Sequence, residues 1–296
     1  MESVHAGPGF VLQEFRCRVP ARAAGPEETA REHQICFVRA GLFERETRQG
    51  RAVADPNHVL FFNAGEPYRV HHPLPGGDDC LVLSLPVGDL LDLLSEQDPA
   101  APERSTAPFA FTHAPCTAKA AVLQRRLLSL TQAGAGAIEL QEVAFALAAE
   151  AVAAVPSSSP SAEAPRSPAT RRQHREAAEA VKVFLAPRLS DSPTLAEIAR
   201  AVGYAPFHLA RLFRREAGLP IHRYLIRLRM RVALERLAED GEDLTRVALD
   251  LGFADHSHFT NAFRREFGVA PSRLRQSLSG RRLRRMRARF PAASSP

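Results

Sequence analysis

Two hydrophobic patterns follow each other along the first half of the chain. From about residue 10 to 86, apolar residues alternate with polar ones or stand in short blocks between turn sequences rich in Pro, Gly, Asn and Asp. Alternation with a period of two is typical of half-buried strands. Five runs have this character: residues 15–19, 34–38, 59–62, 68–71 and 80–85. Their short spacing predicts a β-sandwich or a small β-barrel.

From about residue 117 to 155 the apolar positions recur every three or four residues, which predicts two amphipathic helices. Gly134 and Gly136 interrupt the pattern between them, and Arg125 and Arg126 lie off the first stripe. The stripes consist of Val122, Leu123, Leu127 and Leu130, and of Ile138, Leu140, Val143, Leu147, Val152 and Val155. Such helices either cover the strand domain or pair with a second subunit, and the pattern allows both.

A segment with almost no large apolar side chain comes next. Residues 156–170 read PSSSPSAEAPRSPAT. Such a segment cannot bury enough surface to offset the entropy lost on ordering it. We therefore expect a flexible linker over residues 156–172, followed by a second domain from residue 173.

The second domain contains one unit twice. The sequence IARAVG of residues 198–203 returns as VALDLG at 247–252, an offset of 49 residues. The sequence FRRE of residues 213–216 returns unchanged at 263–266, an offset of 50. Similarity at a fixed spacing indicates a duplicated supersecondary unit.

Each copy predicts a helix, a turn and a helix. Thr194 with Glu197 has the spacing of a capping box, and Asp243 stands at the matching cap position of the second copy. Gly203 ends the first helix of its unit and lets the backbone turn sharply. A continuous helix over residues 221–238, about 27 Å long at 1.5 Å per residue, is expected to join the two units.

The second helix of each copy has an apolar face and an outward polar face. The inward positions are Leu209, Leu212, Phe213, Phe259 and Phe263. Arginine can pair with guanine, and asparagine with adenine, in the major groove of DNA. A polar face is also what water requires, but two such faces in a basic domain favour DNA. The expected contacts are Phe207, His208, Arg211, Arg215, Ser257, His258, Asn261, Arg264 and Arg265.

The basic charge is concentrated in this second domain. The chain of 296 residues has a net charge of +6, but residues 171–290 hold 25 basic and 13 acidic residues, a net charge of +12. Such an excess suits a polyanion. Only Lys119 and Lys182 are lysines, and arginine matches phosphate and guanine better than lysine does. The basic tail, residues 279–296, is expected to add phosphate affinity without sequence preference.

Eleven residues near the C-terminus form one specific motif: Gly252, Phe253, Asp255, Ser257, His258, Phe259, Phe263, Phe267, Gly268, Pro271 and Arg275. With them, the sequence from about 175 to 278 resembles the DNA-binding domain of the AraC/XylS family of bacterial transcription regulators. The resemblance implies two helix-turn-helix units that read DNA with their second helices. It places Phe207, Ala210 and Arg211 in the first of these helices, and Ser257, His258 and Asn261 in the second. Ala210 replaces a residue that is often polar, so Arg211 is expected to read bases for the first unit.

By the order of its patterns, the N-terminal part is similar to the effector domain of that family, a cupin-like β-barrel followed by dimerisation helices. The expected fold is α+β, with a cupin-like barrel, two flanking helices and an all-α tandem helix-turn-helix domain. The expected divisions are an effector domain (1–116), a helical dimerisation segment (117–155), the linker (156–172), the DNA-binding domain (173–278) and the tail (279–296).

The effector is expected to be a small molecule bound inside the N-terminal domain. Candidate contacts are His33, Phe37, Tyr68, Arg69 and His71. The histidine and glutamate set of metal-dependent cupins is missing from the sequence, and the adjacent His71 and His72 would point to opposite faces of a strand. We therefore expect neither a metal nor another cofactor.

The four cysteines have no CxxC spacing, which favours buried thiols over a zinc site. Cys17 and Cys36 have the strand parity of interior residues, and Cys80 can join them. If the three converge, they could bind a soft metal ion or respond to oxidants or electrophiles.

Together with the resemblance, these patterns imply a bacterial, cytoplasmic, nucleoid-associated regulator that is not an enzyme. No secretion signal is found, and the longest apolar run, residues 143–155, is too short for a membrane span. The expected partners are double-stranded DNA, a small-molecule effector, RNA polymerase and a second copy of the chain, and activation is favoured over repression. The alternative is a metal- or thiol-dependent cupin enzyme, or a thiol or metal sensor, tethered to DNA.

Overall fold

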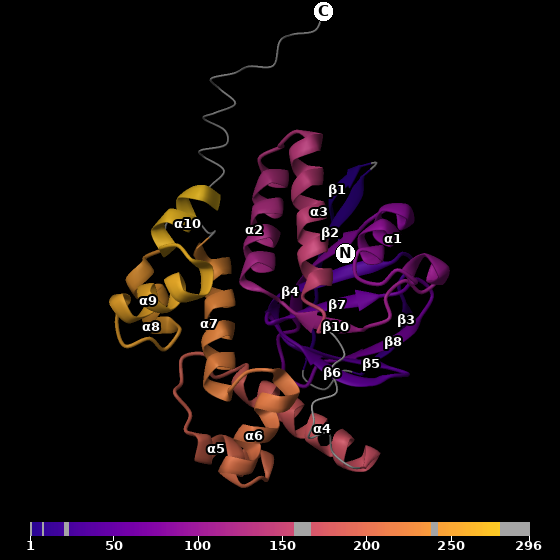
Figure 1. The fold of residues 1–296 in the computed structure, drawn as a ribbon. Helices are drawn as coiled ribbons and strands as arrows, with labels where there is room; N and C mark the ends of the chain where they lie inside the picture. The colour runs from indigo at the N-terminus through magenta and orange to yellow at the C-terminus, as the bar shows by residue number, and fades with distance from the viewer. Residues whose placement is uncertain (1, 8, 21–23, 157–166, 238–241, 279–296) are drawn as a thin grey trace, which may run out of the picture.

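The N-terminal half is built from two antiparallel sheets. The computed structural model describes residues 2–7, 9–20, 24–156, 167–237 and 242–278. Their arrangement is shown in Figure 1. The six-stranded sheet has the order β1 (Glu2–Gly7), β2 (Phe10–Arg16), β9 (Asp78–Ser84), β4 (Gln34–Gly41), β7 (His58–Phe62), β10 (His113–Pro115). The four-stranded sheet has the order β3 (Ala24–Thr29), β8 (Pro67–His71), β5 (Phe43–Thr47), β6 (Gly50–Ala54).

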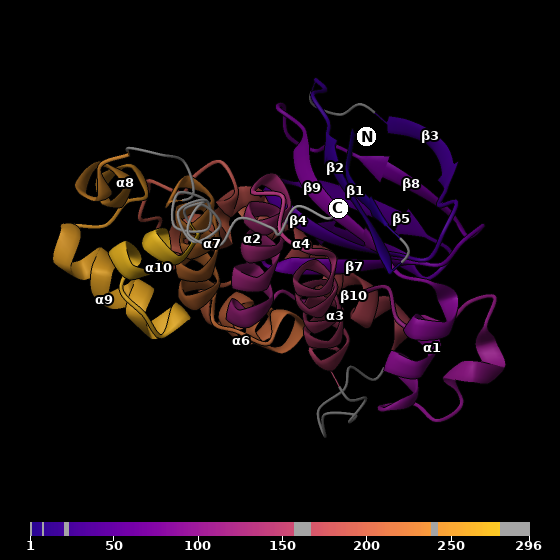
Figure 2. The same ribbon diagram turned by 90° about the horizontal axis from the view of Figure 1, so that it is seen from above.

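The central strands β4, β7 and β9 of the six-stranded sheet are largely buried on both faces. Successive side chains of a strand point to opposite sides. In β4, Ile35 and Phe37 pack into the core shared with the helices, whereas Cys36 and Val38 pack toward the second sheet. Two helices, α2 (Ala118–Gln132) and α3 (Ala137–Ala153), cover the helical side. Viewed from above, α2 and α3 stand between the sheets and the last three helices of the chain (Figure 2).

The sheet domain differs from the sequence prediction in closure and in strand number. Neither sheet closes on itself within the described residues, so the predicted cupin-like barrel is not confirmed. The predicted run 15–19 overlaps only the end of β2, which begins at Phe10. Five strands were not predicted: β1, β3, β5, β6 and β10. Those at 24–29 and 50–54 contain few large apolar residues, so no alternation marks them.

The two predicted helices of residues 117–155 are confirmed, and they cover the six-stranded sheet. One of their side chains was assigned to the wrong side: Ile138, placed in the apolar stripe, is 74% exposed. Arg125, off the first stripe, is buried as well. A further helix, α1 (Val87–Ser95), and the short 3-10 helix η1 (Ala101–Arg104) were not predicted.

The C-terminal domain contains the two predicted helix-turn-helix units. Its helices are α4 (Pro168–Leu185), α5 (Leu195–Val202), α6 (Pro206–Ala217), α7 (Ile221–Leu237), α8 (Leu244–Asp250), α9 (His256–Phe267) and α10 (Pro271–Leu278). The capping box of Thr194 and Glu197 is formed, and the Asp243 side chain caps α8. Helix α4 includes residues 168–172, which the sequence analysis placed in the linker. Linker residues 157–166 and the basic tail lie outside the described residues.

The described part of the chain holds no helix with both the length and the apolar character that crossing a membrane requires.

Gly203 and Gly252 end the first helix of the two units, and they occupy the same left-handed backbone conformation in different surroundings. Their φ angles are +79° and +72°. A β-carbon at Gly252 would lie 2.4 Å from the Ser190 carbonyl oxygen, whereas one at Gly203 would meet nothing within 4 Å.

We expect Gly203→Ala to lower the free energy of unfolding by about 1–2 kcal/mol, the cost of a left-handed L-residue. Gly252→Ala should cost at least about 1 kcal/mol more, because the backbone around Ser190 must also move. Thermal unfolding followed by circular dichroism measures both. Equal losses for the two variants would contradict the close packing at Gly252.

Candidate functional site

Helix α6 presents one buried face and one exposed face. Pro206 occupies the first turn, and Leu209, Leu212 and Phe213 are buried against the rest of the unit. On the other side Phe207 is 86% exposed, and Arg211 is exposed beside it. Among the described residues Arg211 makes no hydrogen bond or ion pair. A large apolar side chain in water next to an unpaired guanidinium is a surface suited to a partner.

The other two predicted DNA contacts on α6, His208 and Arg215, have partners within the same domain. The His208 ring stacks on Tyr204, with 5.7 Å between centroids and 2° between planes. Arg215 forms an ion pair with Glu216 at 3.0 Å and contacts His174 of α4. Arg215 is thus held against its own domain, while His208 remains exposed at its edge.

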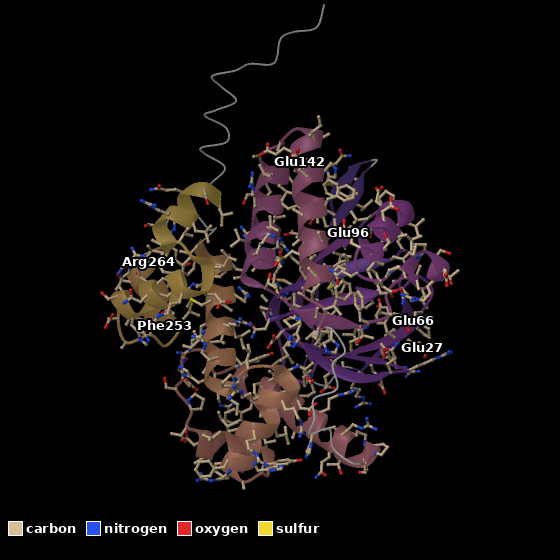
Figure 3. The ribbon with its side chains drawn as sticks, in the orientation of Figure 1. Glu27, Glu66, Glu96, Glu142, Phe253 and Arg264 are labelled. Atoms are coloured by element: carbon tan, nitrogen blue, oxygen red, sulfur yellow. The ribbon has the colours of Figure 1, made fainter. Side chains whose placement is uncertain are left out.

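Helix α9 repeats this arrangement with different chemistry. Asp255 caps the helix by accepting a hydrogen bond from the His258 backbone N–H at 2.7 Å, and α9 begins at His256. Phe259 and Phe263 are fully buried. The predicted contacts Ser257, His258, Asn261, Arg264 and Arg265 are all exposed. Figure 3 shows Arg264 on the outer side of the unit, away from the sheets.

Helix α7, which joins the two units, is docked on the N-terminal domain near its first turn. The Tyr224 hydroxyl donates to Asp55 Oδ2 at 2.7 Å, and Asn57 Nδ2 donates to the Tyr224 carbonyl at 3.3 Å. Both partners lie in the turn between β6 and β7. They bring this turn against the first helix-turn-helix unit.

A buried polar network surrounds this contact. Asp55 is fully buried and lies 2.9 Å from His58 Nδ1, whose other ring nitrogen lies 3.1 Å from Lys182 Nζ of α4. Burial by itself would raise the pKa of the Asp55 carboxyl, but His58, Lys182 and Tyr224 hold it below its usual value. Burial and the Asp55 charge hold the pKa of Tyr224 well above its usual value. The carboxylate is therefore ionised, and the phenol remains its donor.

Two further contacts hold α7 farther along. Glu235 Oε2 accepts from Arg39 of β4 at 2.9 and 2.7 Å, and from Arg125 of α2 at 3.2 Å. The buried Arg231 donates to the Cys116 carbonyl at 2.8 Å and to Glu266 of α9 at 3.1 Å. The N-terminal domain thus contacts the connecting helix at three positions along its length. At one of these, Arg231 also pairs with Glu266 of the second unit.

A cavity of about 290 Å³ lies between the two sheets. Its wall is formed by Phe15, Cys17, Val19, Gly25, Pro26, Glu28, Gln34, Cys36, Phe43, Phe62, Tyr68, Val70, His72, Asp78, Cys80 and Val82. Apolar and aromatic side chains dominate it, with a few polar groups among them, as in many small-molecule sites. Cys17 and Glu28 are only partly buried or exposed, so that side is open to solvent.

Of the five predicted effector contacts, only Tyr68 lines this cavity. Phe37 is buried on the other face of the sheet, under the helices. Arg69 pairs with Glu27 at 3.5 Å, and His71 with Glu46 at 3.0 Å, outside the cavity.

The fifth predicted effector contact, His33, accepts a hydrogen bond from the Ala64 N–H at 3.1 Å near a separate hollow. The four residues outside the cavity therefore have no role as contacts there.

Strand parity could have identified two residues that the prediction missed. Tyr68 and Val70 face the cavity, so His72, two residues further on, falls on the same side. The prediction took the neighbouring His71 instead. Asp78 likewise shares parity with Cys80, two residues further along β9, which was already a candidate.

Cys17, Cys36 and Cys80 all line the cavity, on the face that their parity indicated. Burial and the nearby Asp78 carboxylate raise the pKa of the Cys17 thiol. The Cys36 side chain and burial hold the pKa of Cys80 well above its usual value. Thiols in this state are protonated and react slowly with oxidants, which weighs against a thiol sensor.

Comparisons with known proteins agree with the geometry of the C-terminal domain. A family model described as a helix-turn-helix domain matches residues 170–277. The transcriptional activator RhaS of Escherichia fergusonii is 43% identical over 68 residues, which are 23% of this chain and 24% of RhaS. The transcriptional activator AarP of Providencia stuartii is 30% identical over 100 residues, 34% of this chain and 74% of AarP.

The chain spans only about a quarter to a third of the length of the first curated relatives it matches. Among solved structures, ToxT of Vibrio cholerae aligns over 93% of this chain and 100% of its own, with 11% identity and a TM-score of 0.36.

Two duplicated units, joined by one helix and preceded by a sheet domain, define a tandem helix-turn-helix protein. The chain belongs to the AraC/XylS family of transcription regulators.

Proposed function

We propose that this protein binds specific DNA sites and activates transcription in response to a signal at its N-terminal domain. The observation that carries the proposal is the pair of exposed faces on α6 and α9, with Phe207 and Arg211 on one and Ser257, His258 and Asn261 on the other. These side chains can contact base edges in a major groove. Arg264 and Arg265 on α9 would contact phosphates, which position a protein without reading sequence.

The length of α7 supports binding of both units to one DNA duplex. Its 17 residues span about 26 Å at 1.5 Å per residue. Successive major-groove segments on one side of B-DNA lie about 34 Å apart. Helices of two units joined in this way can enter neighbouring grooves.

The signal would act through the strands that form the cavity. Cys36 and Arg39 belong to the same strand, β4, but Cys36 faces the cavity while Arg39 reaches Glu235 of α7. Glu14 of β2 holds Arg39 from the other side, one residue before Phe15 of the cavity wall. A small molecule in the cavity that shifts β2 or β4 would thus alter the ion pair between Arg39 and Glu235 of α7. Through α7 it would change the spacing of the two units.

Several parts of the proposal rest on the resemblance to the family. The effector domain would comprise residues 1–116 and the dimerisation segment 117–155, with the linker at 156–172, the DNA-binding domain at 173–278 and a basic tail at 279–296. The protein would act as a homodimer in the bacterial cytoplasm, on nucleoid DNA, and contact RNA polymerase. Activation is supported by the names of RhaS and AarP, and both names also favour a regulator over an enzyme.

Selection from random duplexes tests the proposal. The purified chain should enrich sequences with two short conserved blocks, about 10 base pairs apart from centre to centre, because two units bind successive grooves. Sequencing of the bound pool measures this. Enrichment of a single block would contradict simultaneous reading by both units, and enrichment of none would contradict sequence-specific binding.

A further inference from the structure

We propose that Cys17, His72 and Asp78 form a binding site for a zinc-like metal ion in the wall of the cavity between the sheets. The Cys17 sulfur, a ring nitrogen of His72 and a carboxylate oxygen of Asp78 all lie within 4.8 Å of one another. His72 and Asp78 are buried, and Cys17 lies at the partly open side.

The fold brings these residues together from three places. Cys17 follows β2, His72 follows β8, and Asp78 begins β9. The Cys17 N–H donates to the Asp78 carbonyl at 2.8 Å, and His72 Nε2 lies 2.8 Å from Asp78 Oδ1. The three side chains are therefore positioned before any ion arrives, so binding has little chain entropy to overcome.

Backbone packing next to the cluster is too close for any residue but glycine. Gly77 has a φ of +75°, and a β-carbon there would lie 2.1 Å from the Cys17 carbonyl oxygen. The loop between β8 and β9 thus presses Asp78 against Cys17. Glycine is the usual residue where one backbone segment must pass this close to another.

Cys80 orients the carboxylate without belonging to the cluster itself. Its thiol donates to Asp78 Oδ2 at 3.2 Å, which leaves Oδ1 directed to His72. A neighbour that holds a ligand by hydrogen bonding is a recurrent feature of metal sites.

The donor set indicates which ions fit. One sulfur, one nitrogen and one oxygen suit Zn²⁺ and its borderline relatives, whereas Mg²⁺ and Ca²⁺ prefer oxygen alone. Binding would require Cys17 to lose its thiol proton to solvent and His72 to be neutral at the coordinating nitrogen. Three protein ligands leave a fourth position for water or for a molecule in the cavity.

The alternative is that His72 and Asp78 are only a buried polar pair with a thiol beside them. Zinc and cobalt titrations of the full-length protein, without an affinity tag and with its thiols reduced, distinguish the two. We expect one Zn²⁺ per chain in competition with a chromophoric chelator. With Co²⁺ we expect a thiolate-to-cobalt charge-transfer band and the intense visible bands of four-coordinate cobalt.

Cys17→Ser is the decisive variant, because Cys17 is only partly buried and its loss should leave the fold intact. It should lower zinc affinity by more than about tenfold and abolish the charge-transfer band. Cys116→Ser is the matched control, since Cys116 is buried at the start of α2, away from the cavity. It should bind both ions as the wild type does.

No stoichiometric zinc in the wild type, or a cobalt spectrum without the thiolate band, would overturn the proposal. A charge-transfer band that persists in Cys17→Ser would do the same, because another thiol would then be the ligand. If Cys17→Ser fails to fold by circular dichroism, the wild-type cobalt spectrum decides by itself. None of these measurements involves DNA, so their failure leaves the proposed DNA-binding function untouched.

Discussion

Replacing Asp55 by alanine is expected to lower the free energy of unfolding by about 3–5 kcal/mol. The carboxylate is fully buried and accepts from the Tyr224 hydroxyl at 2.7 Å, and His58 lies 2.9 Å away. Without it, the buried Tyr224 hydroxyl and the His58 ring lose their partner. The buried Lys182 ammonium keeps Glu179, 3.0 Å away, but loses the nearby Asp55 charge. Removing one member of a buried charged network is strongly destabilising, because the remaining charges stay buried without a partner. Replacing the whole network by apolar residues changes the free energy of unfolding much less.

Urea unfolding followed by circular dichroism measures this effect, since the chain has no tryptophan. Glu176→Ala is the control, because its ion pair with Arg172 on α4 is exposed and should contribute less than about 1 kcal/mol. Asp55→Ala should also respond less to acid. The folded-state pKa of Asp55 is depressed, so its contribution is present above about pH 4 and is lost as the pH falls through the folded value. A loss no larger than that of Glu176→Ala would show that the network contributes little.

The second large effect is expected on DNA. Each of Arg211→Ala and Asn261→Ala should reduce the preference for the selected site over random DNA by about 1–3 kcal/mol, the value of one good base contact. The two residues lie in different units and share no partner in the described structure. Their effects should therefore add in the double variant, to about 2–6 kcal/mol.

Binding to selected and random duplexes at fixed salt measures this preference, because the electrostatic part of affinity depends on ionic strength. Arg172→Ala serves as the control: this arginine is exposed on α4 and should change affinity for both duplexes alike. Unchanged preference in both Arg211→Ala and Asn261→Ala would contradict the assignment of α6 and α9 to the major groove.

Prediction from sequence succeeded where the signal is local. Three kinds of feature depend on residues only a few positions apart. They are the helix caps at Thr194 and Asp243, the turns at Gly203 and Gly252, and the helical spacing of the buried Phe259 and Phe263. The duplication reinforced each of these assignments. In the sheet domain the same reasoning located five strands but left the choice between a sandwich and a barrel open.

The candidate cavity was predicted less well than the helices. Tyr68 and three cysteines were selected and line it, whereas Phe37, Arg69 and His71 lie on other faces. Alternation along a strand tells which residues face the cavity and which face away from it. It does so only once one residue of that strand is known to face the cavity. The missing information was which face of each strand meets the second sheet.

The sequence alone determined that this protein has two helix-turn-helix units, which faces of their second helices are exposed, and that the strands come before them. Tertiary structure decided how the halves meet. Tyr224 contacts Asp55, and Glu235 contacts Arg39, across separations of 169 and 196 residues. It also decided that Cys17, His72 and Asp78 share one wall of the cavity. Turns, caps and helical periodicity depend on the energies of neighbouring residues, whereas these contacts depend on register and domain docking, which no short stretch of sequence encodes.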